Sequence, residues 1–179
     1  GREVRYAVFS PCNKSLPEGY PKDYLFQELN EAASVLGIKE EAIYKFNFPV
    51  REFPKYRQEI LEELVKISNE FNPELVILPC STDIHQDHHQ LYLEGVRAFK
   101  YTNVIGYELY WNTLVATTNF HIRLEEQNIK AKVNAILKYK SQKARPYVDE
   151  DLIRNQAIMR GAQVKNKYAE AYEFIRWIE

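Results

Sequence analysis

The segment ELVILPC, residues 74 to 80, constrains the fold of this chain more than any other stretch. It is apolar almost throughout, and the residues before it have the spacing of an amphipathic helix. Strands of this composition are typical of parallel sheets that helices cover on both faces. The segment therefore predicts an α/β fold in which strands and helices alternate.

The rest of the chain continues this alternation. Strands are expected where β-branched and aromatic residues cluster, at 3–10, 41–48, 103–111 and 168–177, with a further β-rich stretch at 114–124. Helices are expected at 22–37, 54–73, 90–101, 125–142 and 149–166. This order predicts a Rossmann-like, three-layer fold with a mainly parallel sheet. Because no repeat, low-complexity tract or linker interrupts it, residues 1–179 are expected to form a single domain.

Composition excludes several classes of protein. The 24 basic and 25 acidic residues nearly cancel, so neither a nucleic-acid partner nor a membrane surface is indicated. No apolar run approaches the ~18 residues of a transmembrane helix, and no secretory signal is recognisable. The two cysteines form no C-x-x-C pair, which favours a reduced, cytoplasmic setting. No G-x-G-x-x-G or Walker loop is present, so a nucleotide-binding module is disfavoured.

The segment STDIHQDHHQ, residues 81 to 90, contains three of the four histidines. It directly follows the apolar strand, and ligands of open parallel sheets bind outside the carboxyl ends of strands. His85 and His88 are three residues apart, so both rings can face one point on a helical turn. Histidine is the usual acid or base near neutral pH and the commonest metal ligand, so the pair is a candidate catalytic or metal site.

Two acids of the same segment support this interpretation. Asp83 and Asp87 could each accept the second ring N–H of a histidine, which would fix its tautomer. The alternative is a solvated loop whose acids cap a helix. His89 breaks the three-residue spacing and is expected to be exposed, and the isolated His121 is expected to be structural.

At PCSTDIHQDHH the chain resembles the second motif, D-x-H-x-D-H, of the PIG-L/LmbE-like zinc-dependent de-N-acetylases. The stretches LNEAASVLGI, FNPELVILP, RAFKYTNVIGYELYWN, KVNAILKYKSQ and RGAQVKNKYAEAYEFIRW resemble other parts of that family in the same order. The resemblance spans nearly the whole chain. It implies removal of an N-acetyl group from an N-acetylglucosamine-type sugar or conjugate, a small-molecule substrate, and it suggests a homo-oligomer.

The resemblance also implies roles for residues. Family members hold one zinc ion through two ligands from a His-Pro-Asp-Asp-Glu motif and one histidine of the second motif, which His88 matches. His85 matches the histidine that stabilises the oxyanion or protonates the leaving amine. Asp87 matches the acid between them, a catalytic residue that could support a neighbouring histidine. The general base would be an aspartate of the first motif.

The His-Pro-Asp-Asp-Glu motif does not occur in the 179 residues. We therefore expect the first strand and two zinc ligands to lie in an N-terminal part of a longer chain, or to come from a partner or neighbouring protomer. Cys12 and Cys80 could replace missing ligands, but a loop cysteine and a buried thiol explain them more simply. If the motif is absent from the native protein, the rival function is a non-catalytic sugar-binding or assembly domain.

Three residues near the expected site are candidates for substrate binding. Arg51 lies in a loop after the second strand, where it could bind a hydroxyl, carboxylate or phosphate; a surface arginine is the alternative. Tyr107 and Trp111 lie at the end of the fourth strand, where an aromatic ring could stack on a sugar. Core packing is the alternative for these two aromatic side chains.

Overall fold

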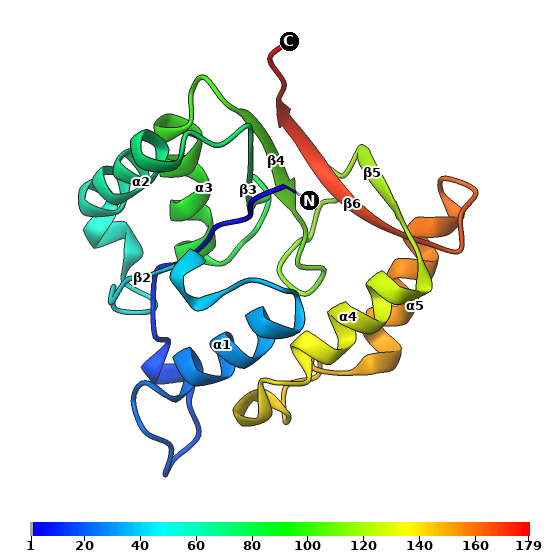
Figure 1. The fold of residues 1–179 in the computed structure, drawn as a ribbon, viewed down its shortest axis with the longest axis horizontal. Coiled ribbons are helices and arrows are strands. Elements are labelled where there is room, and N and C mark those ends of the chain that lie inside the picture. The colour runs from blue at the N-terminus through cyan, green and yellow to red at the C-terminus, as the bar shows by residue number, and fades with distance from the viewer. Residues whose placement is uncertain (1) are drawn as a thin grey trace. The chain divides into compact units, whose positions relative to one another are not determined.

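A computed structural model gives the structure of residues 2–179. Its strands are β1 (Tyr6–Val8), β2 (Ile43–Lys45), β3 (Leu75–Pro79), β4 (Asn103–Tyr107), β5 (Phe120–Leu124) and β6 (Tyr168–Arg176) (Figure 1). Its α-helices are α1 (Tyr24–Val35), α2 (Arg57–Phe71), α3 (Gln86–Ala98), α4 (Glu126–Ile136) and α5 (Glu150–Ala162). Short 3-10 helices occur at Asn13–Ser15, Glu40–Ala42, Phe53–Tyr56 and Lys140–Gln142.

The chain divides into two compact units. One unit comprises residues 1–50 and 123–170, and the other comprises residues 51–122 and 171–179. The unit boundaries fall between Val50 and Arg51, within β5 and within β6.

The unit of residues 51–122 and 171–179 contains the histidine segment. Its four-stranded sheet has the order β3-β4-β6-β5. Strands β3 and β4 are parallel, as expected, whereas β6 runs antiparallel to β4. Helices α2 and α3 lie side by side (Figure 1). Helix α3 approaches β3 closely at Gly95, where an added Cβ would lie 2.6 Å from a methyl carbon of Leu78.

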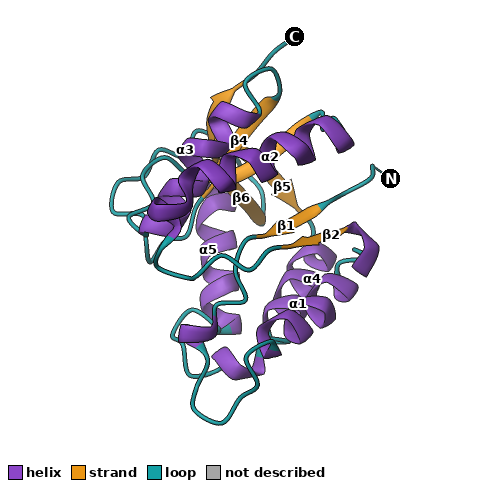
Figure 2. Ribbon diagram, turned by 90° about the vertical axis from the view of Figure 1, so that its left-hand side faces the viewer, coloured by secondary structure: helices purple, strands orange, loops and turns teal. Residues whose placement is uncertain are grey.

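The unit of residues 1–50 and 123–170 has a smaller sheet. Strands β1 and β2 are parallel, with Tyr6 opposite Ile43. Helix α1 lies beside α4 (Figure 2). An apolar cluster between α4, α5 and the start of β6 forms the core and comprises Ile129, Val133, Ile153, Ala157 and Tyr168.

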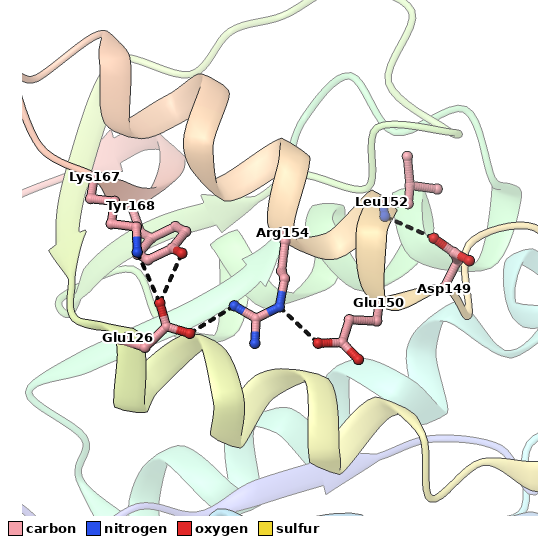
Figure 3. Close-up of polar contacts among 7 residues, drawn as sticks. All are labelled: Glu126, Asp149, Glu150, Leu152, Arg154, Lys167 and Tyr168. Carbon is pink, nitrogen blue, oxygen red and sulfur yellow. Dashed lines mark hydrogen bonds and ion pairs between the residues drawn. The ribbon is translucent and has the colours of Figure 1, made fainter.

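A polar network connects α4 and α5 in this unit (Figure 3). The carboxylate of Glu126 accepts hydrogen bonds from Arg154 at 2.9 Å, from the Tyr168 hydroxyl at 2.8 Å and from Lys167 at 3.2 Å. Arg154 also donates to Glu150 at 2.8 Å. These donors, Arg154 first, lower the pKa of Glu126 to about 2.

Several element boundaries differ from the sequence-based expectation, among them those of α3, β4 and α4. Helix α3 begins at Gln86, earlier than the expected residue 90, because the side chain of His85 caps it. Strand β4 ends at Tyr107 because the following residues form a turn closed by a 2.8 Å bond from the N–H of Asn112 to the carbonyl of Leu109. Helix α4 ends at Ile136, and only Lys140–Gln142 of the remainder is helical. Within residues 2–179, none of the helices has the length and apolar character to cross a bilayer.

Candidate active site at the histidine segment

The histidine segment connects the carboxyl end of β3 to the first turn of α3. A bridge between Asp83 and Thr113 pairs it with the loop after β4. The N–H of Ile84 donates to the carbonyl of Asn112 at 3.0 Å, which fixes the same pairing one residue further. The segment is therefore held in place on the sheet, at the position where open α/β sheets bind ligands.

His85 is the N-cap of α3. Its Nδ1 accepts a hydrogen bond from the backbone N–H of Asp87 at 3.2 Å, so the neutral ring carries its proton on Nε2. Burial, followed by the adjacent His88, lowers the pKa of His85 below its ordinary value. Both effects favour a neutral imidazole whose Nε2–H is a donor.

His88 lies beside His85, and the two rings stack at a centroid distance of 4.5 Å. Nδ1 of His88 lies 2.9 Å from Oδ2 of Asp83, whose side chain is buried. The other oxygen of Asp83 accepts the backbone N–H of His85 at 2.8 Å. A carboxylate can only accept, so Nδ1 of His88 carries the proton and Nε2 presents a lone pair. This is the arrangement of a metal-ligating histidine oriented by a carboxylate.

Asp87 is buried, and its carboxylate faces backbone groups of the loop before α2. Its two oxygens accept the N–H of Arg51 at 2.5 Å and the N–H of Phe53 at 3.2 Å. The contact between an acid and a histidine ring is thus formed by Asp83, and Asp87 holds the loop that carries Arg51.

Arg51 has a backbone φ of 70°, in the left-handed region that non-glycine residues rarely adopt. Its N–H donates to Asp87, and its carbonyl accepts the side-chain amide of Gln86. These bonds from the start of α3 hold a strained conformation, and strain of this kind is concentrated at functional sites. The positive charge of the Arg51 guanidinium also lowers the pKa of His85, as the smallest of the effects on it.

The aromatic candidates Tyr107 and Trp111 lie at the end of β4 and in the loop that follows it. Tyr107 is the last residue of β4, and its carbonyl accepts the N–H of Cys80 at 3.0 Å. Trp111 is 40% exposed and packs edge to face against Tyr110 at 4.8 Å. Trp111 precedes Asn112, whose carbonyl binds Ile84, so its backbone adjoins the histidine segment.

The described residues fit a zinc ion only in part. Across residues 2–179 no group of three His, Cys, Asp or Glu side chains comes together as a metal site. His88 presents a lone pair on Nε2 that a metal could use, whereas a catalytic zinc needs three protein ligands. The expectation of an ordinary buried thiol is confirmed for Cys80, which is fully buried with its sulfur 3.7 Å and 3.6 Å from the hydroxyls of Thr82 and Thr113.

Sequence reasoning did not single out Glu173 on β6. Its carboxylate accepts the N–H and the hydroxyl of Ser81, at the start of the histidine segment, at 2.7 Å and 2.6 Å. The two residues are 92 positions apart, and no local pattern connects them. Gly106, which lies opposite Glu173 in the sheet, was the available signal, since a glycine inside a strand indicates a close approach.

A sequence model of the family described as PIG-L, GlcNAc-PI de-N-acetylase, matches residues 1–99, just over half of the chain. No curated protein sequence matches it.

Several solved structures share the fold. The N,N'-diacetylchitobiose deacetylase from Pyrococcus horikoshii has a TM-score of 0.80 and 19% identity, covering 97% of this chain and 73% of its own. The A40926 pseudoaglycone deacetylase Dbv21 has a TM-score of 0.72 and 15% identity, covering 100% and 88%. The 4-carboxy-2-hydroxymuconate hydratase GalB from Pseudomonas putida has a TM-score of 0.68 and 15% identity, covering 97% and 85%. These likenesses confirm the Rossmann-like α/β fold.

Proposed function

Because the chain belongs to the PIG-L family of GlcNAc-PI de-N-acetylases, we propose that it is a hydrolase that removes the N-acetyl group from an N-acetylglucosamine-type sugar or conjugate. The observation that carries this proposal is the pair of histidines at the end of β3. Neighbouring rings present a lone pair on Nε2 of His88 and a proton on Nε2 of His85. Amide hydrolysis uses both kinds of group, one for a metal and one for the substrate oxygen.

His88 is proposed as one of the protein ligands of a zinc ion. The buried carboxylate of Asp83 fixes the ring in the tautomer that ligation requires. Zinc, when bound, supplies a Lewis acid and lowers the pKa of its water to about 7. The other ligands and the general base are not identified among the described residues.

His85 is proposed to donate a hydrogen bond from Nε2 to the oxygen of the tetrahedral intermediate. A neutral ring whose Nδ1 is already occupied as an acceptor has this one proton to present. The lowered pKa of His85 supports this role over protonation of the leaving amine, which would need an imidazolium. A preorganised donor at the oxyanion is worth roughly 3–4 kcal/mol of transition-state stabilisation in hydrolases.

Arg51, Trp111 and Tyr107 are proposed to bind the substrate. The strained backbone of Arg51 supports its role, because the bonds from Asp87 and Gln86 hold it beside the start of α3. Trp111 is 40% exposed, and an aromatic side chain at the surface can stack on a sugar ring. Asp87 remains part of the proposed site as the carboxylate that holds the Arg51 loop.

A second candidate function is a non-catalytic sugar-binding or assembly domain of the same fold. The observation that favours it is that three metal-ligating side chains do not gather anywhere in residues 2–179. In this function Arg51 and Trp111 would still bind the sugar, but no bond would be hydrolysed.

Acetate release distinguishes the two functions. The native protein, loaded with zinc, would be incubated with an N-acetylglucosamine glycoside, and acetate and free amine would be quantified together. Equal amounts of both products would support the hydrolase. Saturable binding of the glycoside without either product, at every pH from 6 to 9, would favour the non-catalytic domain.

A further inference from the structure

The side chain of Glu173 connects the C-terminal strand to the start of the histidine segment. Glu173 lies opposite Gly106 in the antiparallel pairing of β6 with β4. Its two carboxylate oxygens accept separate hydrogen bonds from Ser81, Oε2 from the N–H at 2.7 Å and Oε1 from the hydroxyl at 2.6 Å. Bidentate contact with a single residue fixes both the position and the orientation of that residue.

Gly106 makes this contact sterically feasible. A Cβ added at position 106 would lie 3.2 Å from Oε2 of Glu173 and 2.8 Å from the Cα of Cys80. The carboxylate therefore passes over a position of β4 that has no side chain, and the chain after β3 approaches the same glycine. A close approach of two other segments is a physical reason for glycine inside a strand.

Ser81 is followed two residues later by Asp83, the acid that binds the backbone N–H of His85 and the ring of His88. Asp83 is 2% exposed and accepts the N–H of His85 at 2.8 Å and Nδ1–H of His88 at 2.9 Å. The backbone between Ser81 and Asp83 is short, so a displacement of Ser81 shifts the carboxylate of Asp83. These contacts connect Glu173 of β6, through Ser81 and Asp83, to the ring of His88.

We propose that Glu173 is a positioning residue, which acts through Ser81 and Asp83 to hold His88 in its Nδ1–H tautomer. This inference rests on the proposed function for its effect on catalysis, but the state of His88 is measurable without substrate. It also assigns a task to the C-terminal part of the chain, since Gly106 and Glu173 lie outside the matched residues 1–99.

The test compares two substitutions at one position. In Glu173→Ala both acceptors of Ser81 are lost, so its N–H is left without a partner. In Glu173→Gln the amide oxygen can accept the Ser81 N–H, and the amide N–H can donate to the hydroxyl, which also acts as an acceptor. The matched control is Glu170→Ala. Glu170 lies on the same strand, β6, and its substitution removes a 2.6 Å ion pair with Lys132 of α4.

The main readout is the tautomer of His88, followed in the zinc-free native protein by the ring nitrogen shifts in NMR spectra. We expect one Nδ1–H species in the wild type, Glu173→Gln and Glu170→Ala, and a mixture of tautomers in folded Glu173→Ala. In the deacetylation assay, Glu173→Ala should lower kcat by about 10-fold or more, which is the effect known for groups that orient metal ligands. The KM should change by less than about twofold. Glu173→Gln should restore kcat to within about threefold.

A folded Glu173→Ala variant with one Nδ1–H species and wild-type kcat would overturn the proposal. If Glu173→Ala does not fold, Ser81→Ala, which removes only the hydroxyl bond, takes its place. A second His88 tautomer in Ser81→Ala would support the proposal, and an unchanged spectrum would overturn it. Absence of deacetylation by the wild type would refute the proposed function, whereas the NMR result would still decide the role of Glu173.

Discussion

Replacement of Asp83 by asparagine tests the account of His88 with a change of one atom. Asparagine has the shape of aspartate, but one of its two terminal groups is an N–H donor. Its oxygen can keep the bond to the N–H of His85, now 2.8 Å long. Its amide then faces Nδ1 of His88, so that nitrogen must become an acceptor and the ring proton must move to Nε2. The metal-ligating lone pair of His88 is thereby lost.

The magnitude follows from the contacts that change. Asp83 is buried and makes two hydrogen bonds that a carboxylate strengthens. Neutral hydrogen bonds contribute about 1 kcal/mol and charged ones about 1.5–3 kcal/mol, so the weakening of two bonds in Asp83→Asn should destabilise the fold by about 1–4 kcal/mol. Loss of a group that orients a metal ligand lowers metal affinity or activity by about 10–100-fold. A similar exchange in the serine protease triad, which also imposes the wrong tautomer, lowers kcat about 10⁴-fold.

Two assays separate these effects. Urea unfolding followed by circular dichroism gives the stability change, and ring nitrogen shifts in NMR spectra give the tautomer of His88. We expect the wild type to show Nδ1–H and Asp83→Asn to show Nε2–H, with zinc affinity reduced. A wild-type protein whose His88 carries its proton on Nε2 would refute the reasoning, because Asp83 could not then be its acceptor.

Three further results are expected. Arg51→Gly should raise the free energy of unfolding by up to about 1 kcal/mol, because glycine adopts the left-handed backbone conformation without strain. The KM for the substrate should rise in the same variant. A lower free energy of unfolding in urea titrations would show that the backbone at Arg51 is not strained. In NMR spectra, His85 should titrate below pH 6.5, because its pKa is lowered in the folded protein. As the pH decreases below 6.5, the unfolded chain therefore binds the proton before the folded protein does, and the free energy of unfolding should fall. A titration midpoint of His85 above pH 6.5 would contradict the capping bond. The pKa of Glu126 is lowered to about 2, so this carboxylate should add stability that is lost as the pH falls from about 4.5 to 2. In Glu126→Gln the free energy of unfolding should therefore depend less on pH in this range. An unchanged pH dependence would show that Arg154 does not bind Glu126 in solution.

The sequence predicted those parts of the site that depend on local pattern. The apolar segment 74–80 predicted a strand, and the histidine segment was expected directly after it, which is where the structure has His85 and His88. Their spacing indicated that the rings could meet, and the rings do stack. The buried state of Cys80 also followed from its place at the end of an apolar run.

Features that depend on distant contacts could not be predicted in this way. The φ of 70° at Arg51 results from bonds to Gln86 and Asp87, about 35 residues away, and nothing in the sequence around Arg51 indicates it. The contact of Glu173 with Ser81 depends on the antiparallel register of β6, whereas the sequence suggested a mainly parallel sheet. The direction of a strand depends on how the connecting segment returns the chain to the sheet. The hydrophobic pattern of the strand does not specify that connection.

The central claim is that His88 is a metal ligand of a deacetylase, and the adjacent His89 provides the control. His89 is exposed and lies 6.1 Å from the ring of Tyr92, whereas His88 is bound to Asp83. Zinc affinity and acetate release from an N-acetylglucosamine glycoside would be measured for the native protein and for His88→Ala and His89→Ala. We predict that His89→Ala stays within about twofold of the wild type and that His88→Ala loses at least about 100-fold in both quantities. Wild-type zinc affinity and acetate release in His88→Ala would contradict the account.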